Sequence, residues 1–597
     1  MIDFSGNHPI IAGILTQCGG EKFRVVHSDR FPGLSQKKVV KKETKMGFVP
    51  IDLSGFQTER LKANPEAVKT KPFQLILPLY FNFGKKMICL SLVKGKTLFA
   101  VSTKSLEVRA GETALSFKVL GGKKQKKNHF ALCKISLPFE TAFGMPAKCE
   151  VEIGYTAPGG TFCKTGMTYC TLPRNLFLGL RSPFAQNKQT KTTAVFRQSV
   201  KNQLKVFVRP WNVTDSIVQR LKQTAAYIAS LLWHTKKAKS LVLLFEKNGE
   251  KYEESASVLY EELINSGYNN AYFVLAKHSL YWPRVAENYK KNILQKYSFR
   301  HYLYFFKAKT FIGTEAVVHA IDLQTYNLLA LRKVGSKNIN YVFLQHGVMY
   351  MVSLNSESRG MFGRKNLNGK YRVVVSSKEE ANHFTTLGGH LAEDMYITGL
   401  PKFDRNIHHE TADTIAIMPT WRPWEIAQAH EDFAGTGYCR MMLSLYENLP
   451  EHLKEKAVIL PHPLVSRQLE TLPKEITEKM VVNKPYDEIL RETAVLITDY
   501  SSIAYDAFSR GARVIFDWSE KDACMQAYGP SPKLMLNETN VFGDVIYHPQ
   551  QLAQIIEENY EKPQREEYQK RYETLVEFQD GNNTKRLMEL LKKDGLI

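Results

Sequence analysis

The sequence lacks several features that would mark other classes of protein. Its eight cysteines are scattered, and Cys163 and Cys170 are too widely spaced for a CxxC metal or redox clip. No apolar run approaches the roughly 20 residues that a membrane-spanning helix needs. The N-terminus lacks the basic-then-apolar pattern of a signal segment. These absences predict a cytosolic chain with reduced thiols.

Two nucleotide-binding signatures and the common metal-binding patterns are also missing. Neither G-x-G-x-x-G nor Walker A opens a predicted strand–helix unit, which argues against a dehydrogenase and a P-loop NTPase. The chain has no Cys/His cluster and no close pair of carboxylates after a strand. A structural zinc ion and a two-metal phosphotransferase site are therefore unsupported. We expect no metal ion built into the protein.

Acidic residues are scarce in the first 240 residues. This segment has 39 Lys and Arg against 13 Asp and Glu, a net charge of +26, whereas the rest of the chain has 42 against 46, a net charge of −4. So basic a segment suits a phosphate polymer, anionic lipid headgroups or nucleic acid. Nucleic acid ranks last, because we find neither an RNA-recognition motif nor a helix-turn-helix pattern. The alternative is a basic domain that is merely soluble.

Length and composition predict a folded protein of three or four domains, since 44% of the residues are hydrophobic and 11% aromatic. Residues 1–200 contain short β-rich runs with no helical pattern between them, which predicts a basic β-rich accessory domain, a sandwich or a similar fold. Residues 201–239 are predicted to hold a linker and an amphipathic helix from Ser216 to about Trp233. The apolar stripe of this helix suits either a membrane interface or packing against the next domain.

From Ser240 onward, short apolar strands alternate with helices, which predicts parallel, doubly wound sheets. We expect two Rossmann-like domains, one over residues 240–395 and one over residues 396–597 with C-terminal helices. The predicted fold class is therefore α/β, a pair of parallel-sheet domains preceded by a β-rich N-terminal domain.

Polar residues stand between the predicted strand of residues 495–498 and a helix that starts near Ile503. They are Asp499-Tyr500-Ser501-Ser502. The unpaired N–H groups of a helix start, two hydroxyls and the positive end of the helix dipole together bind phosphate. An ordinary capped helix without a ligand is the alternative.

Four more predicted strands end in polar or turn residues, and in open α/β sheets that edge is where ligands bind. These endings are His346-Gly347, Thr398-Gly399-Leu400-Pro401-Lys402-Phe403-Asp404, Pro419-Thr420-Trp421-Arg422 and His462-Pro463.

Together with Thr498-Asp499-Tyr500-Ser501-Ser502 and Asp506, these motifs resemble the CDP-glycerol glycerophosphotransferase family, the teichoic-acid primases and polymerases of Gram-positive bacteria. The resemblance covers roughly residues 205–597. It implies a GT-B fold of two Rossmann-like domains, with residues 240–395 on the acceptor side and residues 396–597 on the CDP-donor side. It also implies membrane association, and transfer of an alditol phosphate from a CDP-alditol to a growing chain.

One departure from this family follows Gly347. Many members continue with Thr-Pro-Leu-Lys, whereas this chain has Val348-Met349-Tyr350-Met351. The change leaves the donor side intact. Because the lysine is missing, the resemblance does not identify the acceptor, nor does it decide which alditol is transferred.

An acceptor hydroxyl with a high pKa benefits from a general base, and histidine is the natural candidate near neutral pH. His346 ends a strand of the first predicted sheet and His462 ends one of the second, so we expect them to face each other across a cleft. We assign His346 as the base and His462 as the contact to the donor diphosphate or the leaving phosphate. For each histidine the alternative is a hydrogen-bonded structural residue. Asp404 is the third catalytic candidate, expected to orient a histidine or an acceptor hydroxyl, or else to cap the following turn.

The diphosphate charge is assigned to the helix start at Ser501 and Ser502 and to Arg422, because charge on phosphate oxygens is what catalysis must stabilise. The residues predicted to bind substrate are Gly347, Thr398, Gly399, Pro419, Thr420, Arg422, Pro463, Thr498, Asp499, Ser501, Ser502 and Asp506. No cofactor is required, although a Mg²⁺ ion held loosely on the donor diphosphate is compatible with this site.

The sequence therefore predicts a transferase that moves glycerol phosphate or ribitol phosphate from CDP-glycerol or CDP-ribitol to a teichoic-acid-like wall or capsule polymer, or to a lipid-linked acceptor, and releases CMP. We expect it in the cytoplasm, peripheral on the inner face of the cell membrane. The alternatives are a GT-B glycosyltransferase that uses a nucleotide sugar and a non-catalytic polyanion-binding protein.

Overall fold

The structure, a computed structural model, describes most of the chain. The described residues are 23–26, 39–44, 47–52, 73–95, 106–125, 128–156, 162–169, 184–198, 204–235, 240–322, 327–355, 364, 370–406, 411–425, 428–429, 432–461, 472, 474–481, 484–529 and 533–597. Residues 97–102, one of the short β-rich runs of the first 200 residues, lie outside them.

The chain divides into two compact units. The first comprises Met1–Arg220 with Tyr326–Leu329, and the second comprises Leu221–Thr325 with Ala330–Ile597.

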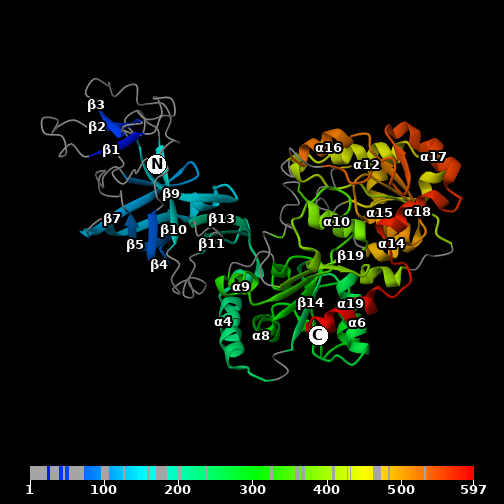
Figure 1. The fold of residues 1–597 in the computed structure, drawn as a ribbon, viewed down its shortest axis with the longest axis horizontal. Coiled ribbons are helices and arrows are strands. Elements are labelled where there is room, and N and C mark those ends of the chain that lie inside the picture. The colour runs from blue at the N-terminus through cyan, green and yellow to red at the C-terminus, as the bar shows by residue number, and fades with distance from the viewer. Residues whose placement is uncertain are drawn as a thin grey trace. The chain divides into compact units, whose positions relative to one another are not determined.

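The first unit is built from short, mainly antiparallel strands (Figure 1). Ten of them form one sheet in the order β10-β4-β5-β8-β7-β6-β9-β13-β12-β11. Because β10 pairs with both β4 and β9, the strands from β4 round to β10 close into a ring. The ring strands are β4 (Phe73–Phe83), β5 (Lys86–Gly95), β6 (Leu106–Ala110), β7 (Thr113–Gln125), β8 (Asn128–Pro138), β9 (Lys148–Thr156) and β10 (Phe162–Tyr169). The predicted β-rich N-terminal domain is confirmed, with a closed ring in place of a sandwich.

Smaller elements complete the first unit. They are β1 (Phe23–Val26), β2 (Val39–Thr44) and β3 (Gly47–Asp52), which form a three-stranded antiparallel sheet, together with α2 (Phe139–Phe143), β11 (Phe184–Asn187), β12 (Thr192–Gln198) and β13 (Leu204–Pro210). The linker predicted to begin at residue 201 is wrong for β13, which pairs with β12 and β9. Leu204, Val206 and Val208 alternate into the core, a two-residue period that marks a strand with one buried face.

The predicted amphipathic helix is α4 (Ile217–Leu232). Its buried residues are small or polar, namely Gln223, Ala226 and Ser230. This side packs on α8 (Phe299–Lys307), where Lys307 Nζ donates to the Ser230 carbonyl over 3.1 Å. The apolar stripe is exposed instead, which contradicts packing of that stripe against the next domain; its members are Ile217, Val218, Leu221, Ile228, Leu231 and Leu232.

The first parallel sheet has seven strands in the order β16-β15-β14-β17-β18-β19-β20, the Rossmann arrangement. Its strands are β14 (Val242–Phe245), β15 (Ala271–Leu275), β16 (Ile293–Gln295), β17 (Thr310–Gly313), β18 (Asn340–Phe343), β19 (Lys370–Val375) and β20 (Met395–Ile397). The connecting helices are α6 (Ser255–Asn265), α7 (Trp282–Asn288), α8, α9 (Leu328–Val334) and α10 (Lys378–Thr386). Strands such as β14 are buried along their whole length, as expected for a parallel sheet covered on both faces.

The second parallel sheet has the order β22-β21-β23-β24-β25. Its strands are β21 (Thr414–Ile417), β22 (Ala457–Ile459), β23 (Thr493–Thr498), β24 (Arg513–Asp517) and β25 (Asp544–Ile546). Its helices are α12 (Gly437–Glu447), α13 (Lys474–Glu478), α14 (Tyr486–Glu492), α15 (Ile503–Ser509), α16 (Lys521–Ala527) and α17 (Leu552–Asn559). The predicted fold class, two Rossmann-type parallel sheets after a β-rich domain, is confirmed.

The last two helices are α18 (Glu566–Leu575) and α19 (Asn583–Lys593). The end of α19 is tied to the first parallel sheet, because Arg372 Nε on β19 donates to Asp594 over 2.9 Å and the Tyr396 hydroxyl on β20 donates to the same carboxylate. The chain therefore returns to the first sheet after completing the second. Within the described ranges, no helix has the length and apolar character to cross a membrane.

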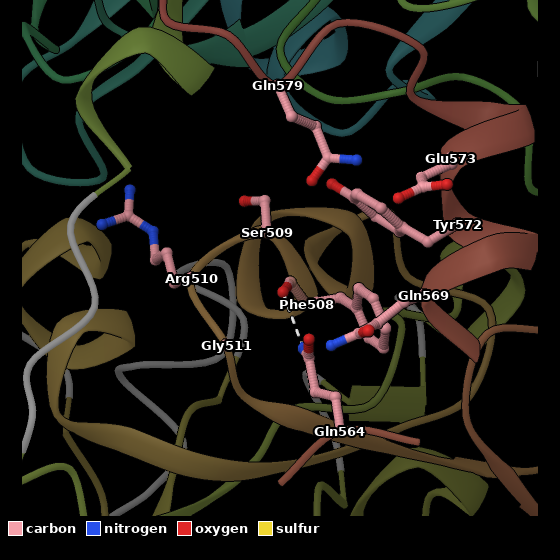
Figure 2. A pocket seen from close by; sticks show the side chains of 9 residues that line it. All are labelled: Phe508, Ser509, Arg510, Gly511, Gln564, Gln569, Tyr572, Glu573 and Gln579. Atoms are coloured by element: carbon pink, nitrogen blue, oxygen red, sulfur yellow. Dashed lines mark hydrogen bonds between the residues drawn. The ribbon is translucent and has the colours of Figure 1, made fainter. Parts of the chain in front are cut away.

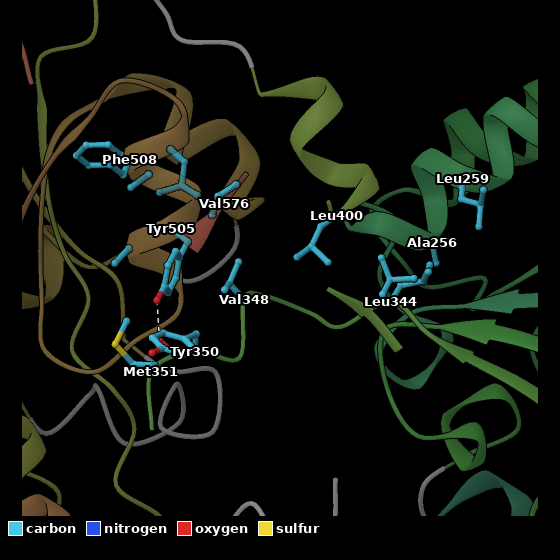
Figure 3. Packing of buried hydrophobic residues seen from close by; sticks show 14 of the residues in the cluster. Ala256, Leu259, Leu344, Val348, Tyr350, Met351, Leu400, Tyr505, Phe508 and Val576 are labelled. Atoms are coloured by element: carbon cyan, nitrogen blue, oxygen red, sulfur yellow. Dashed lines mark hydrogen bonds between the residues drawn. The ribbon is translucent and has the colours of Figure 1, made fainter. Parts of the chain in front are cut away.

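One hydrophobic cluster runs through both parallel-sheet parts of the second unit (Figure 3). Leu344 and Val348 follow β18, while Tyr505 and Phe508 lie on α15. The Tyr505 hydroxyl donates to the Tyr350 carbonyl over 2.6 Å. This continuous core places the residues after β18 against α15.

Candidate functional site

His346 follows the carboxyl end of β18, directly after Gln345, which has an unusual backbone conformation. Gln345 has φ +59°, the left-handed region that residues other than glycine seldom adopt. Its buried side chain donates from Nε2 to the Val374 carbonyl over 2.6 Å and accepts the Met349 N–H over 3.2 Å. Strain of this kind persists only where surrounding contacts hold it. The result is an exposed His346 on a fixed turn.

The four residues that replace the family's Thr-Pro-Leu-Lys form part of the core. Val348, Met349, Tyr350 and Met351 are all buried. Glu380 on α10 fixes this segment, because its carboxylate accepts the N–H groups of Met349 (2.7 Å) and Ser376 (2.6 Å). Burial raises the pKa of Glu380 to about 7. The segment thus packs against α15 and brings no cation of its own to the site.

Gly347 lies directly against the start of α15. A Cβ on Gly347 would stand 2.7 Å from Ser502 Oγ and 3.2 Å from Ser502 Cβ, so a larger residue does not fit without movement. This approach joins the His-Gly motif of the first sheet to the Ser-Ser motif of the second.

Lys402 completes this contact, although the sequence analysis gave it no role. It lies on the 3-10 turn η11 (Pro401–Arg405), and its Nζ donates to the His346 carbonyl over 3.0 Å. The same ammonium pairs with Asp506 on α15 at 2.6 Å and lies 4.0 Å from the position of a Gly347 Cβ. We call His346, Gly347, Lys402, Ser502 and Asp506 the junction. The only sequence signal for Lys402 was a cation inside the Thr-Gly-x-Pro-x-x-Asp motif.

Two acids, Glu246 and Glu254, lie between the carboxyl end of β14 and the start of α6 in the first sheet. Glu246, after β14, accepts the N–H groups of Glu254 (3.0 Å) and Ser257 (2.9 Å) at the start of α6, and burial raises its pKa to about 7. Burial, and then the charge of Glu246, raise the pKa of Glu254, whereas the Lys402 ammonium lowers it. Neither acid lies in a motif that the sequence marks as part of a site.

The Thr-Gly-x-Pro-x-x-Asp motif mostly faces the C-terminal helix. Asp404 accepts the N–H groups of Asn583 (2.9 Å) and Thr584 (2.7 Å), which caps α19. Gly399 has φ +77°, and a Cβ there would meet Asn583 Oδ1 at 2.2 Å. The Thr398 carbonyl accepts from Arg586 Nε over 3.1 Å. Asp404 thus caps the distant helix α19, which differs from the cap of the following turn that was the alternative for it; its catalytic role stays a prediction.

The switch point of the second sheet joins two further motifs. Asp499, after β23, accepts both the N–H (2.7 Å) and the hydroxyl (2.5 Å) of Thr420, after β21. Thr498 Oγ1 donates to the Met418 carbonyl over 2.7 Å, and Pro419 is buried. Burial raises the pKa of Asp499. These residues form the floor of the loop edge where ligands bind in such sheets.

Arg422 is already engaged by protein carboxylates. It is buried, pairs with Glu520, and lies 3.5 Å from Glu425. Its assignment to the donor diphosphate stays a prediction that requires these pairs to rearrange.

The two serines before α15 differ in their surroundings. Ser501 Oγ accepts the Ile503 N–H over 3.4 Å, which is a weak cap, whereas Ser502 makes no side-chain cap bond and faces Gly347. Ser502 is thus the serine nearest the His-Gly turn. His462 and Pro463 lie outside the described residues, so the expected facing of His346 and His462 stays a prediction.

A pocket of about 340 Å³ lies at the other end of α15 (Figure 2). It is lined by Phe508, Ser509, Arg510, Gly511, Gln564, Gln569, Tyr572, Glu573 and Gln579. None of the predicted site residues lines it. In the part of the chain that the structure describes, no group of three or more His, Cys, Asp or Glu residues could hold a metal ion.

Comparison with known proteins yields one curated relative and several solved structures. The curated relative is the minor teichoic acid biosynthesis protein GgaB of Bacillus subtilis (strain 168), 24% identical over 368 residues, which cover 58% of this chain and 39% of GgaB. The chain thus matches well under half the length of this relative. Among solved structures, the wall teichoic acid polymerase TagF aligns with 16% identity and a TM-score of 0.44 over 64% of this chain and 98% of that one. A putative UDP-N-acetylglucosamine 2-epimerase from Listeria monocytogenes aligns with 11% identity and a TM-score of 0.35 over 60% of this chain and 97% of that one.

A family model matches a larger and decisive share of the chain. The model described as CDP-glycerol:poly(glycerophosphate) glycerophosphotransferase matches residues 227–593, which include every motif residue discussed above. The match covers more than half of the 597 residues. The chain therefore belongs to the CDP-glycerol:poly(glycerophosphate) glycerophosphotransferase family.

Proposed function

We propose that the protein transfers glycerol phosphate or ribitol phosphate from CDP-glycerol or CDP-ribitol to a hydroxyl of a teichoic-acid-like or related wall polymer, and releases CMP. The supporting observation is the junction inside the family match, where the His346-Gly347 backbone, the Lys402 ammonium and the start of α15 meet. The second unit holds all these residues.

The chemistry assigned to the junction is a single displacement at phosphorus. The acceptor oxygen attacks the phosphorus that bears the alditol, and the bond from that phosphorus to the oxygen of CMP breaks. His346 takes the proton of the attacking hydroxyl, and CMP leaves with the electron pair of the broken bond. The Lys402 ammonium and the N–H groups that begin α15 stabilise negative charge on the phosphate oxygens.

Lys402 supplies the positive charge for phosphate that the segment after Gly347 lacks. An ammonium has three N–H donors, and the His346 carbonyl and the Asp506 carboxylate engage it from two sides. The remaining donor is available to a phosphate oxygen, and Asp506 keeps the side chain in place.

We propose that the protein has no built-in metal site and that Mg²⁺ binds only together with the donor diphosphate. Such an ion would be held by phosphate oxygens and waters, with few protein ligands. Dialysis against EDTA should then leave the unfolding temperature unchanged, and added Mg²⁺ should act only through donor affinity. A drop in unfolding temperature after dialysis would indicate a built metal site.

A donor screen tests the reaction. Purified protein is incubated with CDP-glycerol, CDP-ribitol or nucleotide sugars together with a short soluble acceptor, and CMP or nucleoside diphosphate is measured. We expect CMP only from a CDP-alditol. A nucleoside diphosphate from a sugar donor, or no release from any donor, would refute the proposal.

Donor binding tests the helix start separately. Replacing Ser501 and Ser502 together by alanine should weaken binding of the CDP-alditol in calorimetry while the circular dichroism spectrum is retained. An unchanged dissociation constant would show that the segment acts only as a helix cap.

We also propose that the enzyme works in the cytoplasm at the inner face of the cell membrane. The support is α4, whose small and polar side packs on the protein while Leu221, Ile228, Leu231 and Leu232 are exposed. An amphipathic helix turned this way suits the headgroup–acyl boundary of a bilayer. Replacing Ile228 and Leu231 by serine should reduce flotation with liposomes; unchanged flotation would remove α4 from membrane binding.

A further inference from the structure

Four neighbouring strands of the first unit contain no acidic residue. β4, β5, β8 and β7 pair in that order, and together they carry six lysines and no aspartate or glutamate. Elsewhere in the ring, β9 carries Glu150 and Glu152, and β6 carries Glu107. These four strands therefore carry positive charge without a carboxylate of their own.

The strand register shows which of these residues share a face. Directly opposed residues of antiparallel strands point to the same side. Leu79 opposes Leu90, Leu90 opposes Lys134, and Lys134 opposes Lys118. In the same register, Phe83 opposes Lys86. Lysines and apolar residues thus lie on one surface, which we call the outer face.

The residues between them point the other way. Met87 and Cys89 on β5, and Cys133 and Ile135 on β8, are buried in the core of the ring. The outer face is therefore the side turned away from this core. It is buried at Ile88 and Ser136, which share its register, and exposed around Leu79, Phe81, Phe83 and Leu132.

Large apolar side chains are exposed on this face. Leu79 is 56% exposed, Phe81 43% and Phe83 73%, and Leu132 on β8 is 40% exposed. An isolated exposed leucine is ordinary, but several large apolar residues on one basic face mark an interaction site.

We propose that the outer face docks on a bilayer that carries anionic lipid headgroups. The lysines pair with headgroup phosphates, while Phe81 and Phe83 enter the boundary between headgroups and acyl chains. The inference rests on the proposed location of the enzyme at the membrane and concerns a unit that the family match, beginning at residue 227, barely reaches.

The exposed apolar residues decide between a membrane and a dissolved polyanion. A phosphate polymer would be bound by lysines alone and would leave Leu79, Phe81 and Phe83 in water. A bilayer removes their apolar surface from water and satisfies the lysines at the same time. The absence of carboxylates on these strands fits both partners, but the phenylalanines fit only the bilayer.

Liposome binding by the full chain tests this proposal. Two double variants probe the face, Lys118→Glu with Lys134→Glu and Phe81→Ser with Phe83→Ser. The matched control is Lys148→Glu with Lys188→Glu, which makes the same change in net charge at two exposed lysines off the face. Binding is measured with phosphatidylcholine vesicles, with and without 30% phosphatidylglycerol, and circular dichroism verifies folding.

We expect the lysine variant to lose about tenfold or more in affinity for the anionic vesicles, since each lysine near such a surface contributes about fivefold. The phenylalanine variant should lose affinity as well, and the control should stay within about threefold. Equal losses in the control and the lysine variant would mean that only total charge acts, and would overturn the proposal.

A phosphate polymer is examined in the same assay. If long-chain polyphosphate displaces the protein from vesicles at constant ionic strength, and the phenylalanine variant binds vesicles like the original protein, the face is a polymer site and the proposal fails. Release of CMP with a soluble acceptor is scored separately. Its absence would refute the proposed reaction, and the vesicle result would still decide the role of the face.

Discussion

Replacing Gly347 by alanine tests the junction at its narrowest contact. The added Cβ would stand 2.7 Å from Ser502 Oγ and 3.2 Å from Ser502 Cβ, whereas an unstrained contact between carbon atoms lies at about 3.5–4.0 Å. Gly347 is not among the residues with positive φ, so the alanine backbone itself is unstrained. The cost is therefore steric and falls on the start of α15.

The magnitude follows from two opposing effects. Overpacking a fixed contact costs about 1–3 kcal/mol. The lower conformational entropy of unfolded alanine returns about 0.4–1 kcal/mol. We expect Gly347→Ala to lower the free energy of unfolding of the second unit by about 1–2 kcal/mol. Because the shift displaces Ser502, the affinity for CDP-glycerol should fall as well.

A double-mutant cycle with Ser502→Gly separates the two effects. Removing the serine side chain clears the space, so the double variant should regain most of the stability lost by Gly347→Ala, with a coupling energy of about 1 kcal/mol or more. It should not regain donor affinity, because the hydroxyl assigned to phosphate is gone. Urea denaturation and calorimetry with CDP-glycerol measure the two quantities.

Additive effects of Gly347→Ala and Ser502→Gly on stability would refute the close approach of the two motifs. So would an alanine variant with unchanged stability and donor affinity.

Three further predictions concern neighbouring groups. Lys402→Met should reduce CMP release by about 100-fold or more, because charge stabilisation of the phosphate is lost. The control Arg405→Met, on the same turn, should change CMP release by less than about threefold, since surface ion pairs contribute little. Similar losses in both variants would show that Lys402 has only a structural role. His346→Ala and His462→Ala should each reduce turnover by about 100-fold or more, and near-normal rates in both folded variants would remove the histidines from the mechanism. Burial raises the pKa of Glu380 from 4.5 to about 7. The stability that this carboxyl contributes to the folded state is therefore fully present below pH 4.5 and is lost as the pH rises through 7, a loss of about 3 kcal/mol. Urea denaturation between pH 5 and pH 8 should show this decline in the original protein and a flatter one in Glu380→Gln.

The elements of the parallel sheets could be predicted from sequence because their signals are local. A short apolar run such as Val495–Thr498, followed by polar residues and a helical pattern, specifies a buried parallel strand whatever lies elsewhere. The prediction at β13 was wrong although its local signal was present. Leu204, Val206 and Val208 alternate as in a strand, but the polar stretch beside them led to the prediction of a linker.

The partners of the site residues could not be predicted, because they come from distant segments. Asp404 is a strand-end acid in the sequence, and only the return of α19 provides the N–H groups that it caps. Lys402 is a cation between two motif residues until folding brings Asp506 and the His346 carbonyl to its ammonium. Sequence spacing carries no information on contacts across more than 100 residues.

The sequence by itself determined the fold class, the order of the strands' polar endings and the concentration of positive charge in the N-terminal segment. These depend on hydrophobic periodicity and composition, which each segment carries alone. The tertiary structure decided that the stripe of α4 faces outward, that the segment after Gly347 is core, and that lysines and phenylalanines share one face of the ring. Each of these depends on which surfaces are buried against others, and burial is a property of the packed molecule as a whole.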